Sequence, residues 1–186
     1  MVDRVSALAG HNLPGHRGDS SKTGIILREP QDLLLHQVAA WRDSIDEVGK
    51  TLAKMIGADA AAGPGSAVTG SKGSMLRIEP MKWWLVGIAA PTFDAEQAAT
   101  LDLSHSRTRL CVSGDDAAEF LNRHFPLDLR EASFPVGTVA SSATHHVGVT
   151  LWHSAEGYEL FIPRGFALSL WEGFVESAEQ FGVEIA

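Results

Sequence analysis

The sequence predicts an α+β protein in which an antiparallel sheet carries helices on one of its faces. Short alternating or apolar segments bounded by Gly, Pro, Asn, Asp and Ser predict several strands joined by turns. Helical periodicity is confined to three segments that interrupt these runs of strands, which is the pattern of an α+β fold. The length of 186 residues fits one domain, or two small subdomains that share a core.

The first 30 residues differ in composition from the rest of the chain. Residues 10–24 contain four glycines and a proline and few side chains that can pack. We therefore expect a flexible N-terminal arm over residues 1–30, with an arm that orders on a partner as the alternative. The folded part then covers residues 31–186, divided into subdomains at about 31–95 and 96–186.

In the first subdomain, a buried strand over Leu33–Trp41 precedes an amphipathic helix. Ser44 and Glu47 have the spacing of a capping box, and Gly57 is placed to end the helix in a left-handed conformation. Residues 58–73, rich in Ala, Gly and Ser, predict a surface loop. Two short strands follow, Met75–Ile78 and Trp83–Ile88.

In the second subdomain, Leu101–Ser113 is the clearest strand, because Thr108, Leu110 and Val112 alternate with Arg107, Arg109 and Cys111. A helix with Asp115 and Asp116 at its start ends before Pro126. The remaining elements are a long strand, a second strand that forms a hairpin with it, and a strongly amphipathic C-terminal helix: Thr138–Trp152, Tyr158–Ile162 and Phe166–Phe181.

Charge and cysteine content exclude several classes of protein. The formal net charge of −8 argues against binding to nucleic acid or to an anionic membrane surface. Cys111 is the single cysteine, which excludes an intrachain disulfide and a multi-cysteine zinc or iron–sulfur site. No apolar run approaches the length of a membrane span, and we expect a cytoplasmic protein.

Motifs for catalysis or cofactor binding are missing from the sequence. It has no Gly-x-Gly-x-x-Gly, and Gly15–Thr23 resembles a phosphate-binding loop only in its Ser-Lys-Thr ending. His145 and His146 are adjacent, so on one strand they would point to opposite faces and bind no common ion. We therefore predict no catalytic, cofactor-binding or metal-binding residue in this chain.

Two features indicate contacts with a partner. Arg107 and Arg109 lie two residues apart on one strand, so both face the same side, where they could bind an anion, cross an interface or face solvent. Trp83 and Trp84 point to opposite sides of a strand, which requires a second covering layer or a partner for one of them. The interface candidates are these arginines and the loop 128–137: Arg107, Arg109, Asp128, Arg130 and Phe134.

The order of several segments resembles the γ subunit of heterotetrameric sarcosine oxidase. The resemblance begins near Leu76, extends to the C-terminus, and rests on a strand with Trp-Leu-Val, an Asp-x-Ser-x-x-Arg-Thr strand, Pro-Leu-Asp-Leu followed by Phe-x-x-Gly, and Pro-Arg before the last helix. The matching residues here are Asp102, Ser104, Arg107, Thr108, Pro126, Leu127, Asp128, Leu129, Phe134, Gly137, Pro163 and Arg164.

The resemblance implies a reduced version of the folate-binding fold of the glycine-cleavage T protein. It also implies a structural, non-catalytic γ subunit beside α, β and δ subunits, in an oxidoreductase that demethylates sarcosine to glycine. The one-carbon unit passes to tetrahydrofolate or leaves as formaldehyde. FAD, FMN, NAD, tetrahydrofolate and zinc are then expected in the partner subunits, with none bound by this chain.

Three alternatives stay open at this point. Related complexes that act on N-methylglutamate or other N-methyl amino acids contain similar γ subunits. A stand-alone, folate-binding aminomethyltransferase-like protein would share the fold, although T proteins are about twice as long. A small interaction domain with a superficial likeness to γ is the third.

Overall fold

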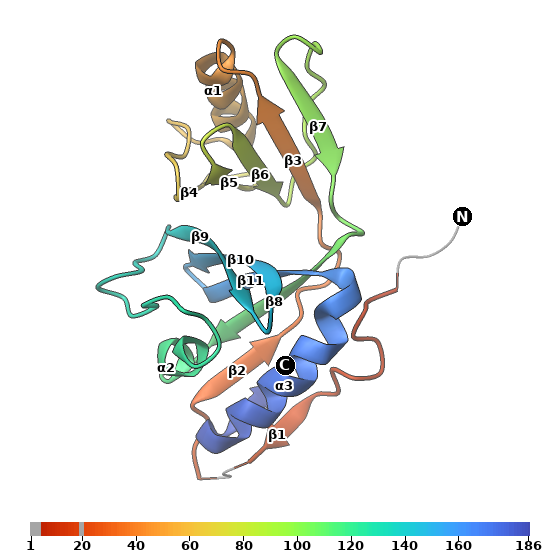
Figure 1. The fold of residues 1–186 in the computed structure, drawn as a ribbon, viewed down its shortest axis with the longest axis vertical. Coiled ribbons are helices and arrows are strands. Elements are labelled where there is room, and N and C mark those ends of the chain that lie inside the picture. The colour runs from red at the N-terminus through yellow and green to blue at the C-terminus, as the bar shows by residue number, and fades with distance from the viewer. Residues whose placement is uncertain (1–4, 19–20) are drawn as a thin grey trace. The chain divides into compact units, whose positions relative to one another are not determined.

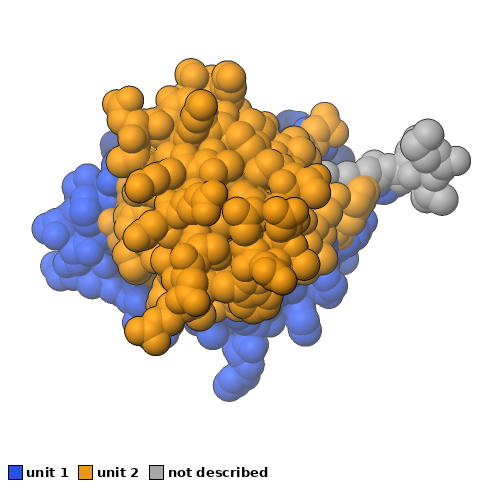
Figure 2. Space-filling model, turned by 90° about the horizontal axis from the view of Figure 1, so that it is seen from above, with its two compact units in different colours: residues 1–31, 106–136, 141–186 blue, residues 32–105, 137–140 orange. Residues whose placement is uncertain are grey.

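The computed structural model describes residues 5–18 and 21–186. The chain forms two compact units, shown in different colours in Figure 2. Unit 1 comprises the chain up to residue 31 together with residues 106–136 and 141–186, and unit 2 comprises residues 32–105 and 137–140. Among the described residues, unit 2 contains a sheet and one α-helix, and unit 1 contains a second sheet and two α-helices, as the ribbon in Figure 1 shows.

Unit 2 is a five-stranded antiparallel sheet in the order β4-β5-β6-β3-β7 with one helix, α1. The predicted strands of this region are present, and β4 lies inside the segment 58–73 that we expected to be loop. The elements are β3 (Leu35–Ala40), α1 (Ile45–Ile56), β4 (Ala67–Thr69), β5 (Ser74–Glu79), β6 (Lys82–Val86) and β7 (Ala98–Asp102).

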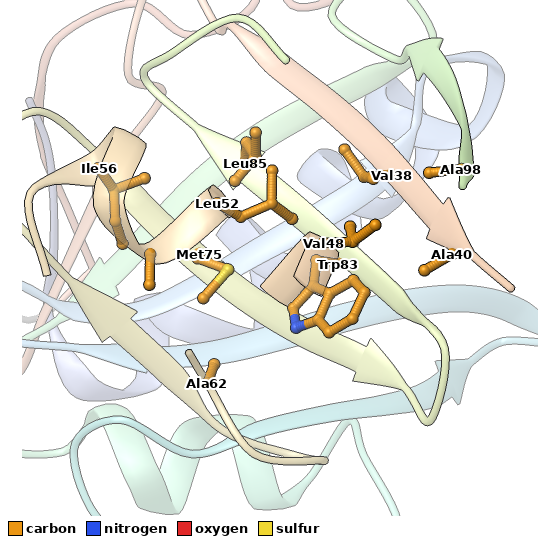
Figure 3. Close-up of a cluster of buried hydrophobic side chains, with 11 residues drawn as sticks. Val38, Ala40, Val48, Leu52, Ile56, Ala62, Met75, Trp83, Leu85 and Ala98 are labelled. Carbon is orange, nitrogen blue, oxygen red and sulfur yellow. The ribbon is translucent and has the colours of Figure 1, made fainter. Parts of the chain in front are cut away.

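The core of unit 2 lies between α1 and one face of its sheet (Figure 3). The α1 side chains with helical spacing pack on the side chains of β3, β5 and β6 that point to the same face, and Trp83 is the largest of them. Trp84, on the opposite face of β6, is also buried, and its indole N–H donates to Gln37 at 3.2 Å. Both tryptophans are therefore interior residues.

The two ends of α1 test the predicted caps. Gly57 ends the helix with φ 78°, as predicted. The capping box is wrong, because the Ser44 side chain makes no bond to the helix amides. Its hydroxyl lies instead against the carbonyl oxygens of Trp41 and Gln97, which join the start of α1 to the segment before β7.

Unit 1 contains a seven-stranded sheet in the order β1-β12-β2-β8-β11-β10-β9, in which β12 and β2 form a parallel pair. Two short 3₁₀ turns flank α3. The elements are β1 (Gly15–Arg17), β2 (Ile25–Arg28), β8 (Arg107–Ser113), α2 (Ala117–Asn122), β9 (Val139–Thr144), β10 (Val147–Ser154), β11 (Gly157–Pro163), α3 (Ala167–Ala178) and β12 (Val183–Ile185).

The helices of unit 1 meet through aromatic side chains. Phe120 of α2 packs edge to face on Phe174 of α3, with ring centroids 6.1 Å apart, and on Phe181 at 6.2 Å. The apolar stripe of the C-terminal helix is buried as predicted. No helix of residues 5–18 and 21–186 is long and apolar enough to cross a bilayer.

The predicted flexible arm is wrong for the residues that the structure describes; residues 1–4 and 19–20 of the arm lie outside them. Ile25 and Leu27 are fully buried because β2 sits inside the sheet, between β12 and β8. Leu8 is also fully buried, and β1 pairs with β12. The segment belongs to unit 1.

The predicted strand 101–113 is two strands in two different sheets. The chain leaves β7 in a turn in which the backbone N–H of Ser104 donates to the carboxylate of Asp102 at 2.8 Å. The Ser104 hydroxyl in turn accepts the N–H of Leu35 at 3.0 Å, so this turn is fixed within unit 2. The boundary between the units therefore lies after His105 rather than at 95/96.

The predicted strand 138–152 is likewise interrupted, by a turn at His145 and His146. Both residues have positive φ, 47° and 66°, which is the geometry of a two-residue hairpin turn that usually takes Asn or Gly. The side chains therefore do not alternate across one strand as the sequence analysis assumed. The hairpin of β10 and β11, by contrast, confirms the prediction.

Candidate functional site

A buried ion pair joins β8 to β11 in unit 1. The guanidinium of Arg109 binds both carboxylate oxygens of Glu159, through Nε and Nη2, at 2.8 Å each. The side chain of Glu159 is 0% exposed and that of Arg109 is 20% exposed. The hydroxyl of Ser154 adds a third donor to Glu159, at 3.3 Å. Such bidentate charge-assisted bonds satisfy a carboxylate that has no access to water.

Cys111 lies in the same row of the sheet, between Arg28 of β2 and Glu159 of β11. Burial, followed by the negative charge of Glu159, raises the pKa of the Cys111 thiol to about 11. The thiol is therefore protonated at neutral pH, as expected of a small packed residue and not of a reactive cysteine.

The donor atoms of Cys111, Glu156 and Glu159 lie within 4.8 Å of one another, which raises the question of a metal site. Glu159 already binds Arg109, and Glu156 binds Arg28. A divalent cation would have to displace both guanidinium groups and deprotonate a thiol of raised pKa. The cluster is therefore best described as an ion-pair network that links β2 to the β10–β11 turn and β8 to β11.

The loop between α2 and β9 contains three of the predicted interface residues. Asp128 and Arg130 form an exposed ion pair, and the Ser133 hydroxyl also donates to Asp128. The hydrogen bonds from Arg130 and Ser133 hold the pKa of Asp128 well below its usual range. Phe134, by contrast, is buried, so its side chain contributes to the interior of unit 1.

His153 and Tyr158 hold this loop against the sheet. Their rings stack at 4.2 Å across the β10–β11 pair, and Phe134 stacks on the His153 ring at 6.4 Å. His153 Nδ1 lies 2.7 Å from the carbonyl oxygen of Phe134, and the Tyr158 hydroxyl donates to the carbonyl of Leu129 at 2.6 Å. Sequence reasoning missed both residues, although they follow and begin the two strands of the predicted hairpin and are opposite neighbours in it.

Arg107 and Arg109 share a strand face, as predicted, but differ in surroundings. The Arg107 guanidinium donates to the carbonyl oxygen of Ser106 at 3.2 Å, and burial lowers the pKa of Arg107. Arg109 is committed to Glu159. The interface role of these arginines, and of Asp128, Arg130 and Phe134, stays a prediction.

A cavity of about 480 Å³ lies on unit 1 between α3 and the turn of the β9–β10 hairpin. Its lining is mostly apolar, with one imidazole and one hydroxyl: His145, Val147, Phe166, Ser169, Leu170, Gly173 and Phe174. Phe174 also contacts the ring of His124, whose Nε2 is buried without a hydrogen-bond partner among the described residues. The cavity has the size of a ligand pocket, but its lining contains no carboxylate, Lys or Arg that could orient a ligand.

Comparison with known proteins places this geometry in context. No family model matches the chain. A curated relative, the sarcosine oxidase γ subunit of an Arthrobacter species, is 29% identical over 120 residues, which is 64% of this chain and 59% of that protein. The resemblance that the sequence analysis identified is thus confirmed, over a segment that spans less than two thirds of the relative.

Solved structures agree with the predicted fold. One match is a chain of the heterotetrameric sarcosine oxidase from Corynebacterium sp. U-96, solved in complex with pyrrole 2-carboxylate. The superposition covers 96% of this chain and 96% of that chain, with a TM-score of 0.77 and 19% identity. The glycine cleavage system aminomethyltransferase T from Bartonella henselae matches with a TM-score of 0.57 and 17% identity, covering 88% of this chain and 48% of that one. The α+β, T-protein-like fold class is therefore confirmed.

Proposed function

We propose that this chain is the γ-type subunit of a heterotetrameric sarcosine oxidase-type complex. The observation that supports it best is the structural match that covers 96% of both chains, together with the sequence relative of the γ class. In this assignment the complex demethylates sarcosine to glycine oxidatively, and the one-carbon unit passes to tetrahydrofolate or leaves as formaldehyde. The α, β and δ subunits are the partners of this chain, in the cytoplasm.

The chemistry of the polar interior supports a structural role. Glu159, the fully buried carboxylate, is neutralised by Arg109 within the chain. The buried thiol of Cys111 is protonated, and its neighbours Glu156 and Glu159 already bind guanidinium groups. These groups stabilise the sheet of unit 1 rather than stand ready for a substrate. We therefore propose that FAD, FMN, NAD, tetrahydrofolate and zinc are held by the partner subunits.

Two other functions follow from the same fold. A related complex that oxidises N-methylglutamate or another N-methyl amino acid would use a similar subunit, because the substrate is bound elsewhere. A stand-alone, folate-binding aminomethyltransferase-like protein is favoured only by the match to aminomethyltransferase T, of which this chain covers 48%. Isothermal titration of the isolated chain with tetrahydrofolate separates this last reading, since micromolar binding would support it.

Deletion of the gene for this chain from its host tests the proposal. We expect the deletion strain to lack the fully assembled sarcosine oxidase complex. Expression of this chain from a plasmid should restore the complex. The assay is sarcosine-dependent oxygen consumption across gel-filtration fractions, with N-methylglutamate as the comparison substrate. Unchanged size and activity of the complex in the deletion strain would refute the assignment.

A further inference from the structure

Strand β7 leaves an open edge on the sheet of unit 2. The strand order ends at β7, which among the described residues pairs with β3 alone. From Ala99 to Asp102 every residue of the strand is exposed. An edge strand of this kind presents unpaired backbone N–H and C=O groups to any other extended chain.

Hydrogen bonds at the two ends of β7 define which backbone groups point outward. The N–H of Trp41 donates to the carbonyl of Gln97 at 3.2 Å, and the N–H of Leu103 donates to the carbonyl of Leu35 at 2.8 Å. Every second residue of an antiparallel strand bonds to the same neighbour. Residues 97, 99, 101 and 103 therefore bond toward β3, whereas Thr100 and Asp102 direct their N–H and C=O groups to the open side.

Most of the features that protect solitary edge strands are missing from β7, whose one charged residue is Asp102 at its end. Such strands are commonly very short, or they contain a bulge, a Pro or charged residues, Lys above all. The five-residue sequence Ala-Ala-Thr-Leu-Asp contains neither Lys nor Pro, and its register with β3 is continuous. Leu101 adds an apolar side chain that is 54% exposed. The strand is therefore suited to pairing.

The charges around β7 indicate the chemistry of its partner. Asp94 and Glu96 are exposed in the segment before the strand, and the Asp102 side chain at its end is 55% exposed. Three basic side chains lie near these carboxylates. The exposed Arg42 follows Trp41, whose N–H bonds to Gln97, the His36 imidazole is 3.9 Å from Asp102, and Arg107 comes five residues after Asp102 in the chain. Exposed carboxylates nevertheless lie at both ends of the edge, and a complementary segment carries Lys or Arg at its ends.

We propose that β7 is a docking edge at which an extended segment of another subunit of the complex adds a strand to the sheet of unit 2. The segment has an apolar side chain beside Leu101 and basic residues at its ends. Its backbone pairs with the outward N–H and C=O groups of Thr100 and Asp102. This inference rests on the proposed function, because it takes the partner from the same complex.

Thr100→Pro is the variant that separates edge pairing from folding. Proline removes the outward N–H of residue 100 and blocks the approach of a strand, yet it leaves the bonds of Ala99 and Leu101 to β3 in place. Thr100→Ala keeps the N–H and is the matched control. Leu101→Lys, which adds the charge typical of protected edges, is a second variant that removes no backbone donor.

The assay uses the chain co-expressed with the α, β and δ subunits of its host and the same chain purified alone. We expect the affinity of Thr100→Pro for the complex to fall about tenfold or more, while Thr100→Ala binds as the wild type does. Hydrogen–deuterium exchange of the wild type should show the amides of Thr100 and Asp102 exchanging at least tenfold more slowly in the complex. The amide of Leu101, which bonds to β3, should be protected in both states.

Each other result overturns one specific claim. Assembly of Thr100→Pro and Leu101→Lys with wild-type affinity overturns the docking edge and leaves the proposed function intact. Slow exchange of the Thr100 and Asp102 amides in the isolated chain means that the edge is already covered, by the chain itself or by a second copy in a dimer. This result also overturns the docking edge. Failure of the wild-type chain to join the three subunits contradicts the proposed function itself.

Discussion

Replacement of Arg109 by Met tests whether the ion pair between β8 and β11 holds unit 1 together. The variant keeps most of the side-chain length but removes the two N–H groups that bind Glu159 at 2.8 Å. Glu159, which is 0% exposed, then keeps the hydroxyl of Ser154 as its one side-chain donor among residues 5–18 and 21–186. Removal of one partner from a buried pair costs about 3–5 kcal/mol, a large part of the 5–15 kcal/mol that stabilises a typical domain.

The assay is chemical and thermal unfolding of the purified chain. For a protein of this size, a loss of about 3–5 kcal/mol lowers Tm by roughly 6–20 °C. The double variant Arg109→Met/Glu159→Leu removes both charges, so we expect it to be more stable than Arg109→Met alone. Lys82→Met, which breaks the surface pair with Glu79 in unit 2, is the control and should change stability by less than about 1 kcal/mol. An Arg109→Met variant as stable as Lys82→Met would refute the reasoning.

Three further predictions concern unit 1. Burial lowers the pKa of His124, so the unfolded chain binds more protons and stability falls as the pH drops below about 6.5; His124→Phe should weaken this dependence in pH-resolved unfolding, and an unchanged slope would contradict it. Tyr158→Phe removes the bond to the carbonyl of Leu129 and should lower stability by about 1 kcal/mol. The amides of the loop 126–136 should then exchange faster than in the wild type. Equal exchange rates would contradict the claim that Tyr158 holds this loop against the sheet. Gly114→Ala should destabilise the chain by at least about 1–3 kcal/mol, because φ is 108° and a Cβ would lie 2.3 Å from the carbonyl oxygen of Gly24. Gly148→Ala, with no atom within 4 Å, is its control and should differ little from the wild type.

Elements with a strong local pattern were predictable from the sequence. The apolar stripe of α1, the left-handed Gly57 and the buried face of α3 all follow from side-chain spacing within one element. The hairpin of β10 and β11 follows from alternation around a polar turn. These features depend on neighbours along the chain, which a single sequence displays directly.

The sequence was misleading where a distant segment decides the structure. Thr108, Leu110 and Val112 alternate as expected in β8, but the break before them depends on Ser104 reaching the backbone of Leu35. Ile25 and Leu27 form a core strand only because β12 and β8, which are remote in sequence, lie on either side of it. Local composition contains no record of such pairing.

The ion-pair network was only partly predictable. The shared strand face of Arg107 and Arg109 follows from their spacing, but which of them meets a carboxylate depends on the register of β11 against β8. In that register Glu159 lies opposite Cys111, and Arg109 lies opposite Phe161. Arg109 and Glu159 are therefore diagonal neighbours on the same face of the sheet. A buried Glu in a strand of otherwise apolar residues, as in Tyr-Glu-Leu-Phe-Ile, was the available sign of a buried cationic partner.

Purification of the native complex through a C-terminal tag on this chain tests the central claim most directly. The visible spectrum and the subunit masses of the purified material are recorded at modest salt. We predict a yellow complex that contains this 19.9 kDa chain, a large flavoprotein and two further subunits, and that is bleached by sarcosine or a related N-methyl amino acid. A colourless chain that purifies alone, from cells in which sarcosine oxidase activity is present, would contradict the account.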